Sequence, residues 1–489
     1  MQRITELSAA PLFDIAASRR IETAAAQTLA PHTLMRRAGL AVARLAMAVA
    51  PHARCIWIAC GPGNNGGDGF EAAAQLRQRG FTPVVSFAGN EARLPGDARD
   101  ALARARAAGV SFLEEAPANF DLAIDALLGI GAARTPEGQM AQWLARMYAG
   151  PAPVLSVDLP TGLHADTGAL AHPLVNPIGG MAKRYCLNLL TLKPGVFTAH
   201  GRDAAGEIWF DDLGSSHAWA GESPIARLAG APAHSPRPHA SHKGHWGDVA
   251  VVGGAPGMGG AALLAATAAL HSGAGRVFAA LLDPAAPTVD PQKPALMLRS
   301  AESLAFDAMT VVCGCGGGTA VRAQLPRVLA SAPRAVLDAD ALNVIATDEA
   351  LQQQLRARAA RGRPTVLTPH PLEAARLLGI NAAEVQADRL AAAGALVRRY
   401  AATVVLKGSG SVTAAEGQAP VINLTGNARL ASAGTGDVLA GMIGAALATH
   451  GNAFEAAWQA VWRHGAAADR WPTAESLTAD ALAQRPCSP

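Results

Sequence analysis

The sequence predicts an α/β protein with two parallel sheets. Short apolar runs that end in Gly, Asp or Pro alternate with helical stretches rich in Ala, Arg and Leu, a pattern typical of buried strands joined by helices. Half of the 489 residues are hydrophobic and only 16% are charged, so the chain can bury a large core. Because 489 residues exceed the usual size of one domain, we expect about two to four domains.

The predicted strands fall into two groups along the chain. In the first half they cover residues 55–60, 84–87, 122–127 and 154–159. In the second half they begin at residues 248, 277, 310, 335, 365 and 403. Between the groups, residues 221–238 (GESPIARLAGAPAHSPRP) are rich in proline and small residues, which predicts an irregular linker. We therefore expect one domain over residues 1–220 and a second over residues 239–489.

Charge and composition exclude several classes of partner. The 41 Lys and Arg residues against 38 Asp and Glu give a net charge of +3, too small for a nucleic-acid-binding protein of this length. The six cysteines form no CxxC pair, as expected for reduced thiols in the cytoplasm. The uncharged stretch 249–275 contains glycines and Pro256, which favours a strand, a turn and a buried helix over a membrane span. We expect a cytoplasmic protein that binds small molecules.

The first candidate site is the glycine-rich segment GPGNNGGDGF at residues 61–70. It lies between a predicted strand and a predicted helix, where glycines leave backbone N–H groups free to face an anion. The segment fits the pattern GxGxxG, but no acidic residue follows about 20 residues later, where a dinucleotide-binding fold would contact a ribose. A tight turn without a ligand is the alternative.

Acidic residues close two further strands of the first half. Asp125 and Asp158 each follow a strand, and the carboxyl ends of parallel strands line one crevice. A single Asp after a strand is more often a helix cap, so the repetition is what favours a site. We expect both carboxylates to converge with the polar side chains of Asn64, Asn65, Asp68 and Thr161.

The second candidate site is the segment GTGD at residues 434–437, which opens a predicted helix. Backbone N–H groups and the helix dipole can stabilise a phosphoryl group in transfer there. Asp437 would repel a phosphate unless it acts on the nucleophile, so we predict a general base that takes a hydroxyl proton. The alternative is that Asp437 only favours the helix N-terminus.

Other polar segments end strands of the second half. Lys407 precedes a Gly/Ser loop that could cradle a nucleotide, although the same pattern is also an ordinary hairpin. His370 ends a strand before a helix, but a solitary histidine is more often structural. The acidic strand end at Asp338 and the glycine-rich residues 313–319 are further candidates. The spacing of His239, His242 and His245 is a weaker indication of a metal site.

The first 215 residues resemble the epimerase domain of NAD(P)H-hydrate repair enzymes, through GPGNNGGDGF, DALLGIG, VDLPTG and LKPGVFTAHG. The resemblance implies a Rossmann-like three-layer domain that binds the hydrated dinucleotide and K⁺. It implies Asn65, Asp125 and Thr161 as potassium ligands and Asp158 as an acid/base that also contacts the substrate. The remaining implied substrate contacts are Asn64, Asn65, Gly66, Gly67, Asp68, Gly129, Ile130, Gly131, Ala132, Ala133, Arg134 and Thr135. Arg36 departs from the family, which usually has an acid at this position.

Residues 242–480 resemble the ribokinase-like α/β domain of ADP-dependent NAD(P)H-hydrate dehydratases, through HKGHWGDVAVVGG, TPHPLE, LKGSGS and GTGDVLAG. The resemblance implies Mg²⁺ with ADP and Asp437 as the catalytic base. The implied hydrate contacts are Ala261, Gly316, His370 and Asp437. The implied nucleotide contacts are Lys407, Gly408, Ser409, Gly410, Ser411 and Gly436. This chain departs from the family pattern at Ala295, Cys315, Gly317 and Ala433.

Together the two resemblances imply metabolite repair of NADHX and NADPHX, the hydrated forms of NADH and NADPH. The first domain would interconvert the R and S epimers, and the second would dehydrate the S epimer with ADP and release AMP and phosphate. Hydroxide is a poor leaving group, and phosphorylation of the hydroxyl makes phosphate the leaving group. The alternative is a ribokinase-like kinase for a vitamin precursor, fused to a non-catalytic binding domain. We also expect a homo-oligomer.

Overall fold

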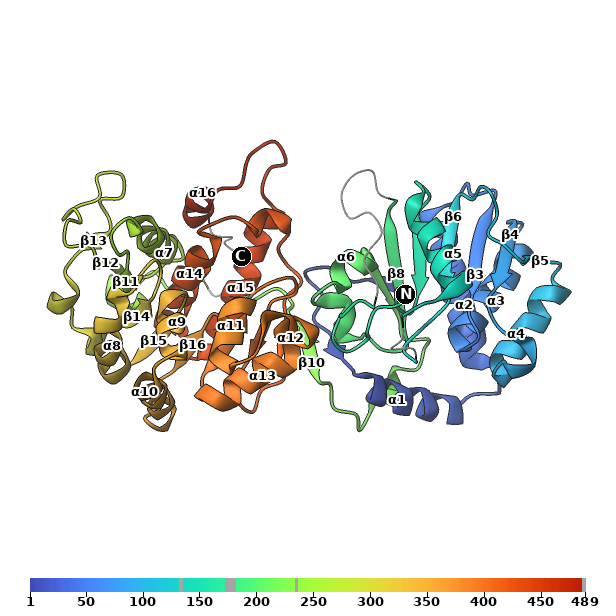
Figure 1. Ribbon diagram of the computed structural model, residues 1–489, viewed down its shortest axis with the longest axis horizontal. Helices are drawn as coiled ribbons and strands as arrows, with labels where there is room; N and C mark the ends of the chain where they lie inside the picture. Colours follow the sequence, from blue (N-terminus) through green and yellow to red (C-terminus); the bar gives the residue numbers. More distant parts are fainter. Residues whose placement is uncertain (132–134, 172–181, 234–235, 486–489) are drawn as a thin grey trace. The chain divides into compact units, whose positions relative to one another are not determined.

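The computed structural model describes residues 1–131, 135–171, 182–233 and 236–485, and the chain divides into two compact units (Figure 1). The first unit comprises Met1–Thr5 and Ala10–Ala226, and the second comprises Glu6–Ala9 and Arg227–Pro489. Each unit has a largely parallel sheet with helices, which confirms the predicted fold class. No helix in the described ranges is both long and apolar enough to cross a membrane.

The first unit is built on an eight-stranded sheet with the order β1-β9-β8-β7-β6-β3-β4-β5. Its strands are β1 (Gln2–Arg3), β3 (Ile56–Cys60), β4 (Pro83–Phe87), β5 (Ser111–Leu113), β6 (Leu122–Ala126), β7 (Val154–Val157), β8 (Arg184–Leu189) and β9 (Glu207–Asp211), and the short β2 (Pro11–Leu12) precedes the first helix. The chain runs outward from β3 through β4 and β5, then returns to β6 on the other side of β3. Ligands of open α/β sheets bind in the crevice at such a reversal.

Helices cover both faces of this sheet. They are α1 (Ile15–Gln27), α2 (Thr33–Val49), α3 (Asn64–Gln78), α4 (Gly96–Ala107), α5 (Gly138–Ala149) and α6 (Gly201–Ala205). Alternate residues of β3 point to opposite faces: Ile56 and Ile58 belong to the core beneath α2, α3 and α4, whereas Trp57 packs with Trp143 of α5. The first unit is therefore the three-layer domain that the resemblance implies.

The helix after β3 begins earlier than the sequence predicts. Residues 61–70 were expected to form a glycine-rich turn, but α3 starts at Asn64. The glycines inside it permit close packing, because a β-carbon on Gly66 would lie 2.0 Å from the carbonyl oxygen of Gly61. A β-carbon on Gly67 would lie 2.7 Å from the side chain of Met35. These two glycines serve the approach of α3 to its neighbours rather than an open loop.

The sheet of the second unit has the order β13-β12-β11-β14-β15-β16-β17-β18-β19-β10. Its strands are β10 (Ala226–Leu228), β11 (Asp248–Gly253), β12 (Arg276–Leu281), β13 (Met297–Leu298), β14 (Thr310–Cys313), β15 (Arg334–Leu337), β16 (Thr365–Leu367), β17 (Thr403–Leu406), β18 (Val412–Ala414) and β19 (Val421–Ile422). Strands β11 to β17 pair in parallel, and β18 is antiparallel to β17 and to β19. The predicted strands of the second half are confirmed.

The described part of the second unit contains ten α-helices. They are α7 (Gly259–His271), α8 (Leu325–Ser331), α9 (Asp340–Ala346), α10 (Glu349–Ala360), α11 (Pro371–Leu378), α12 (Ala382–Ala387), α13 (Arg389–Tyr400), α14 (Thr435–His450), α15 (Ala453–Asp469) and α16 (Ala479–Gln484). Helices α7 and α14 approach closely, since a β-carbon on Gly441 would lie 2.0 Å from the carbonyl oxygen of Ala265. The apolar stretch 249–275 is β11, a turn and α7, as predicted.

The predicted linker contains one regular element. Strand β10 lies within residues 221–238 and pairs in parallel with β19. Ala226 and Leu228 are buried, and the guanidinium of Arg227 lies over the ring of Trp458 at 5.1 Å. The expectation of an entirely irregular segment was wrong here, because two apolar residues in alternation are enough for a short strand when a sheet offers a partner.

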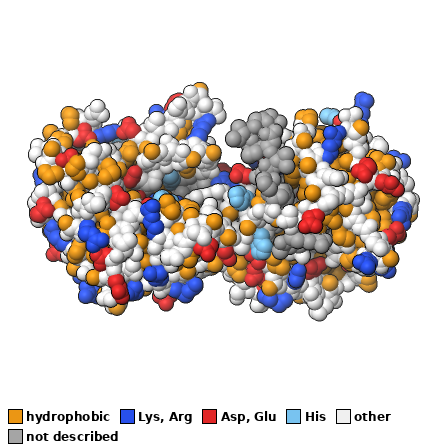
Figure 2. Space-filling view, viewed as in Figure 1, with side chains coloured by type: hydrophobic (Ala, Val, Ile, Leu, Met, Phe, Trp, Pro, Cys, Tyr) orange, Lys and Arg blue, Asp and Glu red, His pale blue; other side chains and the backbone are white. Residues whose placement is uncertain are grey.

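Surface charge agrees with the composition. Figure 2 shows basic and acidic side chains interspersed over the face in view, without a large basic patch. The net charge of the chain is +3.

Candidate active sites

A cavity of about 480 Å³ lies outside the carboxyl ends of β3 and β6 in the first unit. The predicted site residues that line it are Asn64, Asn65, Asp68, Gly129, Ile130, Gly131 and Asp158. Gly66 and Gly67 lie inside α3 instead, and the Thr135 hydroxyl donates to the carbonyl oxygen of Ala171 at 3.3 Å. Ala132, Ala133 and Arg134 lie outside the described residues.

Asp125 and Thr161 are not among the residues that line this cavity, but they are buried and hydrogen-bonded to each other. The Thr161 hydroxyl donates to Asp125 Oδ1 at 2.6 Å, and the Thr161 backbone N–H donates to Asp125 Oδ2 at 2.9 Å. Asn65 is 9% exposed, and its Nδ2 finds no hydrogen-bond partner within the described part of the chain. A β-carbon on Gly129 would lie 3.1 Å from Asn65 Oδ1. Asp125 and Thr161 thus pair a carboxylate with a hydroxyl, and Asn65 of the same unit has a buried amide; oxygens of these kinds suit a hard cation.

Asp158 is held in a strained conformation beside a buried lysine. Its φ of 64° is left-handed, which is uncommon for a residue other than glycine and frequent at functional sites. The backbone N–H of Leu189 donates to Asp158 Oδ1 at 3.1 Å, and the Lys193 ammonium donates to the same oxygen. Lys193 is 2% exposed, lines the cavity, and also donates to the Leu189 carbonyl oxygen at 2.8 Å.

Lys193 was not predicted as a site residue, although it lies in the motif LKPGVFTAHG. Arg19 and Glu22 of α1 also line the cavity and were not predicted, because they belong to no motif. Burial raises the pKa of Asp68 well above its usual range, and the carboxylates of Asp158 and Glu22 raise it further. The cavity is therefore an acidic pocket with Lys193 as a buried cation in its wall.

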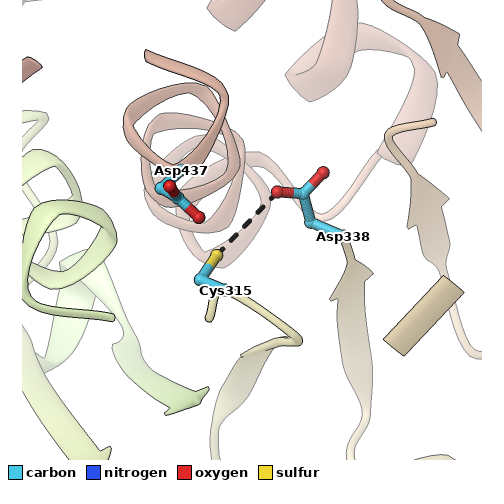
Figure 3. A group of neighbouring side chains, drawn as sticks. All are labelled: Cys315, Asp338 and Asp437. Carbon is cyan, nitrogen blue, oxygen red and sulfur yellow. Dashed lines mark hydrogen bonds between the residues drawn. The ribbon is translucent and has the colours of Figure 1, made fainter. Parts of the chain in front are cut away.

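The second candidate site lies at the carboxyl ends of β14 and β15 and at the start of α14. Figure 3 shows the side chains of Cys315, Asp338 and Asp437 pointing toward one another from these three elements. Their ligand atoms all lie within 4.8 Å of one another. The Cys315 thiol donates to Asp338 Oδ2 at 4.0 Å. The family departure at Cys315 therefore adds a thiol to a pair of carboxylates.

Lys407 reaches the same cluster from the end of β17. Its ammonium lies 2.7 Å from Asp338 Oδ1 and 3.9 Å from Glu373 Oε2. A β-carbon on Gly436 would lie 3.4 Å from Lys407 Nζ, which places the ammonium beside the first turn of α14. The structure brings Lys407, Gly436 and Asp437 together with Asp338, which the sequence analysis also names as a candidate, and with Glu373, which it does not.

The surroundings of Asp437 make it a stronger base than a free carboxylate. Burial raises the pKa of Asp437 to about 6, and the neighbouring Asp338 carboxylate contributes to the rise. The Cys315 thiol and the Lys407 ammonium act in the opposite direction. A pKa of about 6 leaves the group mostly ionised at neutral pH and increases its affinity for a proton, as a general base requires.

His370 has a structural role at the start of α11. Its Nδ1 accepts from the backbone N–H groups of Leu372 and Glu373 at 3.1 and 3.3 Å. In return, Glu373 Oε2 accepts from the backbone N–H of His370 at 2.7 Å. This reciprocal capping box supports the structural alternative. His370 also belongs to the second site, because Glu373 contacts both its ring and Lys407.

The other predicted contact residues of the second site lie in or beside turns that contain glycine. Gly316 has a φ of 56°, and a β-carbon on it would lie 2.8 Å from Ala261 Cβ, so these two implied hydrate contacts adjoin. Residues 407–411 connect β17 to β18, and the Ser411 hydroxyl donates to the Gly408 carbonyl oxygen at 3.1 Å. The rings of His242 and His245 stack at 3.7 Å, but the histidines join no metal-ligand group of the described chain.

Known proteins are similar to both units of the chain. The family model described as YjeF-related protein N-terminus matches residues 31–195, and the one described as NAD(P)H-hydrate dehydratase matches residues 249–485. The chain is 36% identical over 469 residues to the bifunctional NAD(P)H-hydrate repair enzyme Nnr of Escherichia coli (strain K12). The matched region covers 92% of this chain and 88% of that relative.

Two further similarities concern the second unit. The ADP-dependent (S)-NAD(P)H-hydrate dehydratase of Neisseria meningitidis serogroup B is 45% identical over 251 residues, which is 50% of this chain and 83% of that relative. The solved structure of the ADP/ATP-dependent NAD(P)H-hydrate dehydratase from Bacillus subtilis, co-crystallised with ATP and Mg²⁺, is 30% identical with a TM-score of 0.45, covering 51% of this chain and 91% of that one.

Proposed function

The chain belongs to the family of bifunctional NAD(P)H-hydrate repair enzymes, and on this premise we propose how its residues share the two reactions. The first unit is the NAD(P)H-hydrate epimerase, and the second is the ADP-dependent NAD(P)H-hydrate dehydratase. One observation carries the division of roles: each unit has a Lys–Asp pair at the carboxyl ends of its own sheet, the buried Lys193–Asp158 and the partly buried Lys407–Asp338.

In the second unit, Asp437 takes the proton of the substrate's ring hydroxyl. The hydroxyl oxygen then bonds to the terminal phosphorus of ADP, and the bond from that phosphorus to AMP breaks. Loss of phosphate and of a ring proton restores the double bond and yields NAD(P)H. The role of Asp437 is supported by its raised pKa and by its place in the first turn of α14, where N–H groups face a phosphoryl group.

In our proposal the substrate and the nucleotide both bind at this cluster. Ala261, Gly316 and His370 contact the hydrate, while residues 407–411 and Gly436 contact the nucleotide. Mg²⁺ accompanies the nucleotide and is held chiefly by its phosphates, as is usual for this ion. The carboxylates of Asp338 and Asp437 are suitable oxygen donors, whereas the Cys315 thiol is too soft a ligand for Mg²⁺.

In the first unit, Asp158 is the acid/base of epimerisation and Lys193 orients it. We assign the substrate to the 480 Å³ cavity, with Asn64, Asp68 and residues 129–131 as contacts. The proposal is supported by the strained φ of Asp158 and by the buried ammonium on its carboxylate.

A potassium ion fits Asn65, Asp125 and Thr161 by the chemistry of its donors. The unpartnered Nδ2 of Asn65 supports this, because rotation of the amide by 180° would put an oxygen at that position. The Asp125→Ala variant should then lose epimerase activity and keep dehydratase activity, and epimerisation should rise with K⁺ concentration in the wild type. Equal epimerisation with and without K⁺ would contradict the ion.

We also propose that the two activities are separable, with the domain division at the predicted linker. A fragment of the second unit must retain β10, because that strand pairs with β19. A fragment that starts at residue 222 should dehydrate the S epimer with ADP and leave the R epimer to spontaneous conversion. Rapid consumption of both epimers by this fragment would overturn the division.

The whole proposal is tested by incubating the protein with a mixture of both hydrate epimers. With ADP and Mg²⁺, the absorbance of the reduced nicotinamide should recover completely. Without ADP, the epimers should interconvert and no absorbance should return. A kinase for a vitamin precursor, the second candidate function, would recover no absorbance under either condition.

A further inference from the structure

We propose that Arg389 is a positioning residue of the dehydratase: its buried guanidinium fixes the end of β17, and thereby Lys407 and Gly408, for binding of the nucleotide. This inference rests on the proposed nucleotide role of residues 407–411. Arg389 lies on a different element, in the first turn of α13, and belongs to none of the motifs in which a site was predicted.

The guanidinium joins the end of β17 to the helices beside it. Arg389 is only 1% exposed. Its Nη2 donates to the carbonyl oxygens of Leu406 and Lys407, both at 3.0 Å, and its Nη1 donates to Gln386 Oε1 at 2.6 Å. Burial lowers the pKa of Arg389 to about 10, so the group remains charged at neutral pH and these are charge-assisted hydrogen bonds.

Gly408 lies so close to Arg389 that the position favours glycine. Its φ of 134° is disfavoured for residues with a β-carbon, and a β-carbon there would lie 3.0 Å from Nη1 and 3.1 Å from Nη2 of Arg389. The backbone of the nucleotide loop therefore lies directly against the guanidinium. Two consecutive carbonyl contacts and one close approach fix the direction in which the chain leaves β17.

The position of the Lys407 ammonium depends on this direction. The backbone carbonyl of Lys407 is bonded to Arg389, while its side chain reaches Asp338 at 2.7 Å beside Gly436. Loss of the guanidinium would free the end of the strand and displace both the ammonium and the loop. Because displacements of about an ångström weaken binding and catalysis strongly, nucleotide affinity should suffer first.

The chain contains a matched control in Arg358. This arginine is 0% exposed, donates to the carbonyl oxygens of Leu329 and Ala332 at 2.9 Å and to the Thr365 hydroxyl at 2.7 Å, and its pKa is also lowered by burial to about 10. Thr365 begins β16, so Arg358 serves the end of the sheet opposite to the active site. Replacing either arginine removes a buried cation with carbonyl partners, but only Arg389 adjoins the nucleotide loop.

The experiment compares Arg389→Met and Arg358→Met in the full chain, by ADP-dependent dehydration of the S epimer and by calorimetric binding of ADP. Both variants should melt below the wild type. Arg389→Met should raise KM for ADP by about tenfold or more with a smaller change in kcat, and Arg358→Met should leave KM for ADP within twofold. Arg389→Lys should recover part of the lost ADP affinity, because its ammonium can reach a single carbonyl.

Equal KM values for ADP in the two methionine variants would overturn the inference. If Arg389→Met does not fold, the comparison of Arg389→Lys with Arg358→Lys decides in the same way: a raised KM in the first alone supports the positioning role, and equal values reject it. A wild-type enzyme that dehydrates the S epimer without any need for ADP would instead overturn the proposed function on which the inference rests.

Discussion

The two units use the same pair of residue types in different ways. Each has a lysine whose ammonium contacts an aspartate at the carboxyl ends of its sheet, Lys193 with Asp158 in the first and Lys407 with Asp338 in the second. In the first unit this aspartate is itself the proposed acid/base. In the second, the proposed base is a third residue, Asp437, whose side chain adjoins the Cys315 thiol and the Asp338 carboxylate.

The surroundings of the proposed catalytic carboxylate therefore differ between the two units. The Lys193 ammonium holds the Asp158 carboxylate in one orientation within the cavity wall. Lys407 is bonded to Asp338 instead, so burial acts on Asp437 with less compensation, and the pKa of Asp437 rises to about 6. A Lys–Asp pair at strand ends thus indicates a site without identifying the aspartate that exchanges the proton.

The largest expected effect is that of Asp437→Asn on dehydration. Loss of a general base typically lowers the rate by ~10²- to 10⁴-fold. ADP binding and epimerisation should persist, and the variant should melt no lower than the wild type at pH 8, because burial penalises the ionised carboxylate. Turnover within threefold of the wild type would show that Asp437 only serves the helix N-terminus.

Breaking the pair of the first unit should have the next largest effect. Lys193→Met leaves the Asp158 carboxylate without its ammonium, and epimerisation should fall on the order of 10²-fold, as expected for a displaced acid/base. The matched control is Arg104→Met, which breaks the ion pair of 2.7 Å with the buried Glu71 away from the cavity. That control should lower the melting temperature without a comparable loss of epimerisation. Similar losses of epimerase activity in the two variants would show that Lys193 has only a structural role.

The pH dependence of dehydration by the second unit should show a smaller effect than these substitutions. Because protonated Asp437 cannot accept a proton, kcat/KM should fall about tenfold per pH unit below a pH of about 6. The folded-state pKa is raised, so protonation stabilises the fold as the pH falls through 6 toward the ordinary value of 3.8. Activity should therefore be lost on acidification before stability is lost. A rate independent of pH between 5 and 8 would contradict this assignment.

The sequence predicted the sheets better than the partners of the site residues. Alternating apolar runs located the strands, and GTGD located the start of α14 correctly. The early start of α3 was missed because the glycines of NNGGD serve close packing, which depends on neighbours distant in the sequence. The acidic strand ends at Asp125 and Asp158 were found from their repetition, and the structure brings Asp125 into hydrogen bonds with Thr161.

Other site residues could not be predicted because their importance depends on tertiary contacts. Lys193 and Glu373 lie in motifs that were noticed, but only the fold shows which carboxylate or ammonium each one meets. Arg389 gave no indication in the sequence, since arginines in helices are usually exposed.

The central claim is that the two units act in succession on one substrate. It is tested most directly with full-length Asp158→Asn and Asp437→Asn proteins, given the R epimer, ADP and Mg²⁺. Each variant alone should restore reduced-nicotinamide absorbance no faster than spontaneous epimerisation or spontaneous dehydration allows, and an equimolar mixture of the two should restore it at a rate approaching that of the wild type. If either variant alone matches the wild type, or if the mixture recovers no more than its parts, the claim is contradicted.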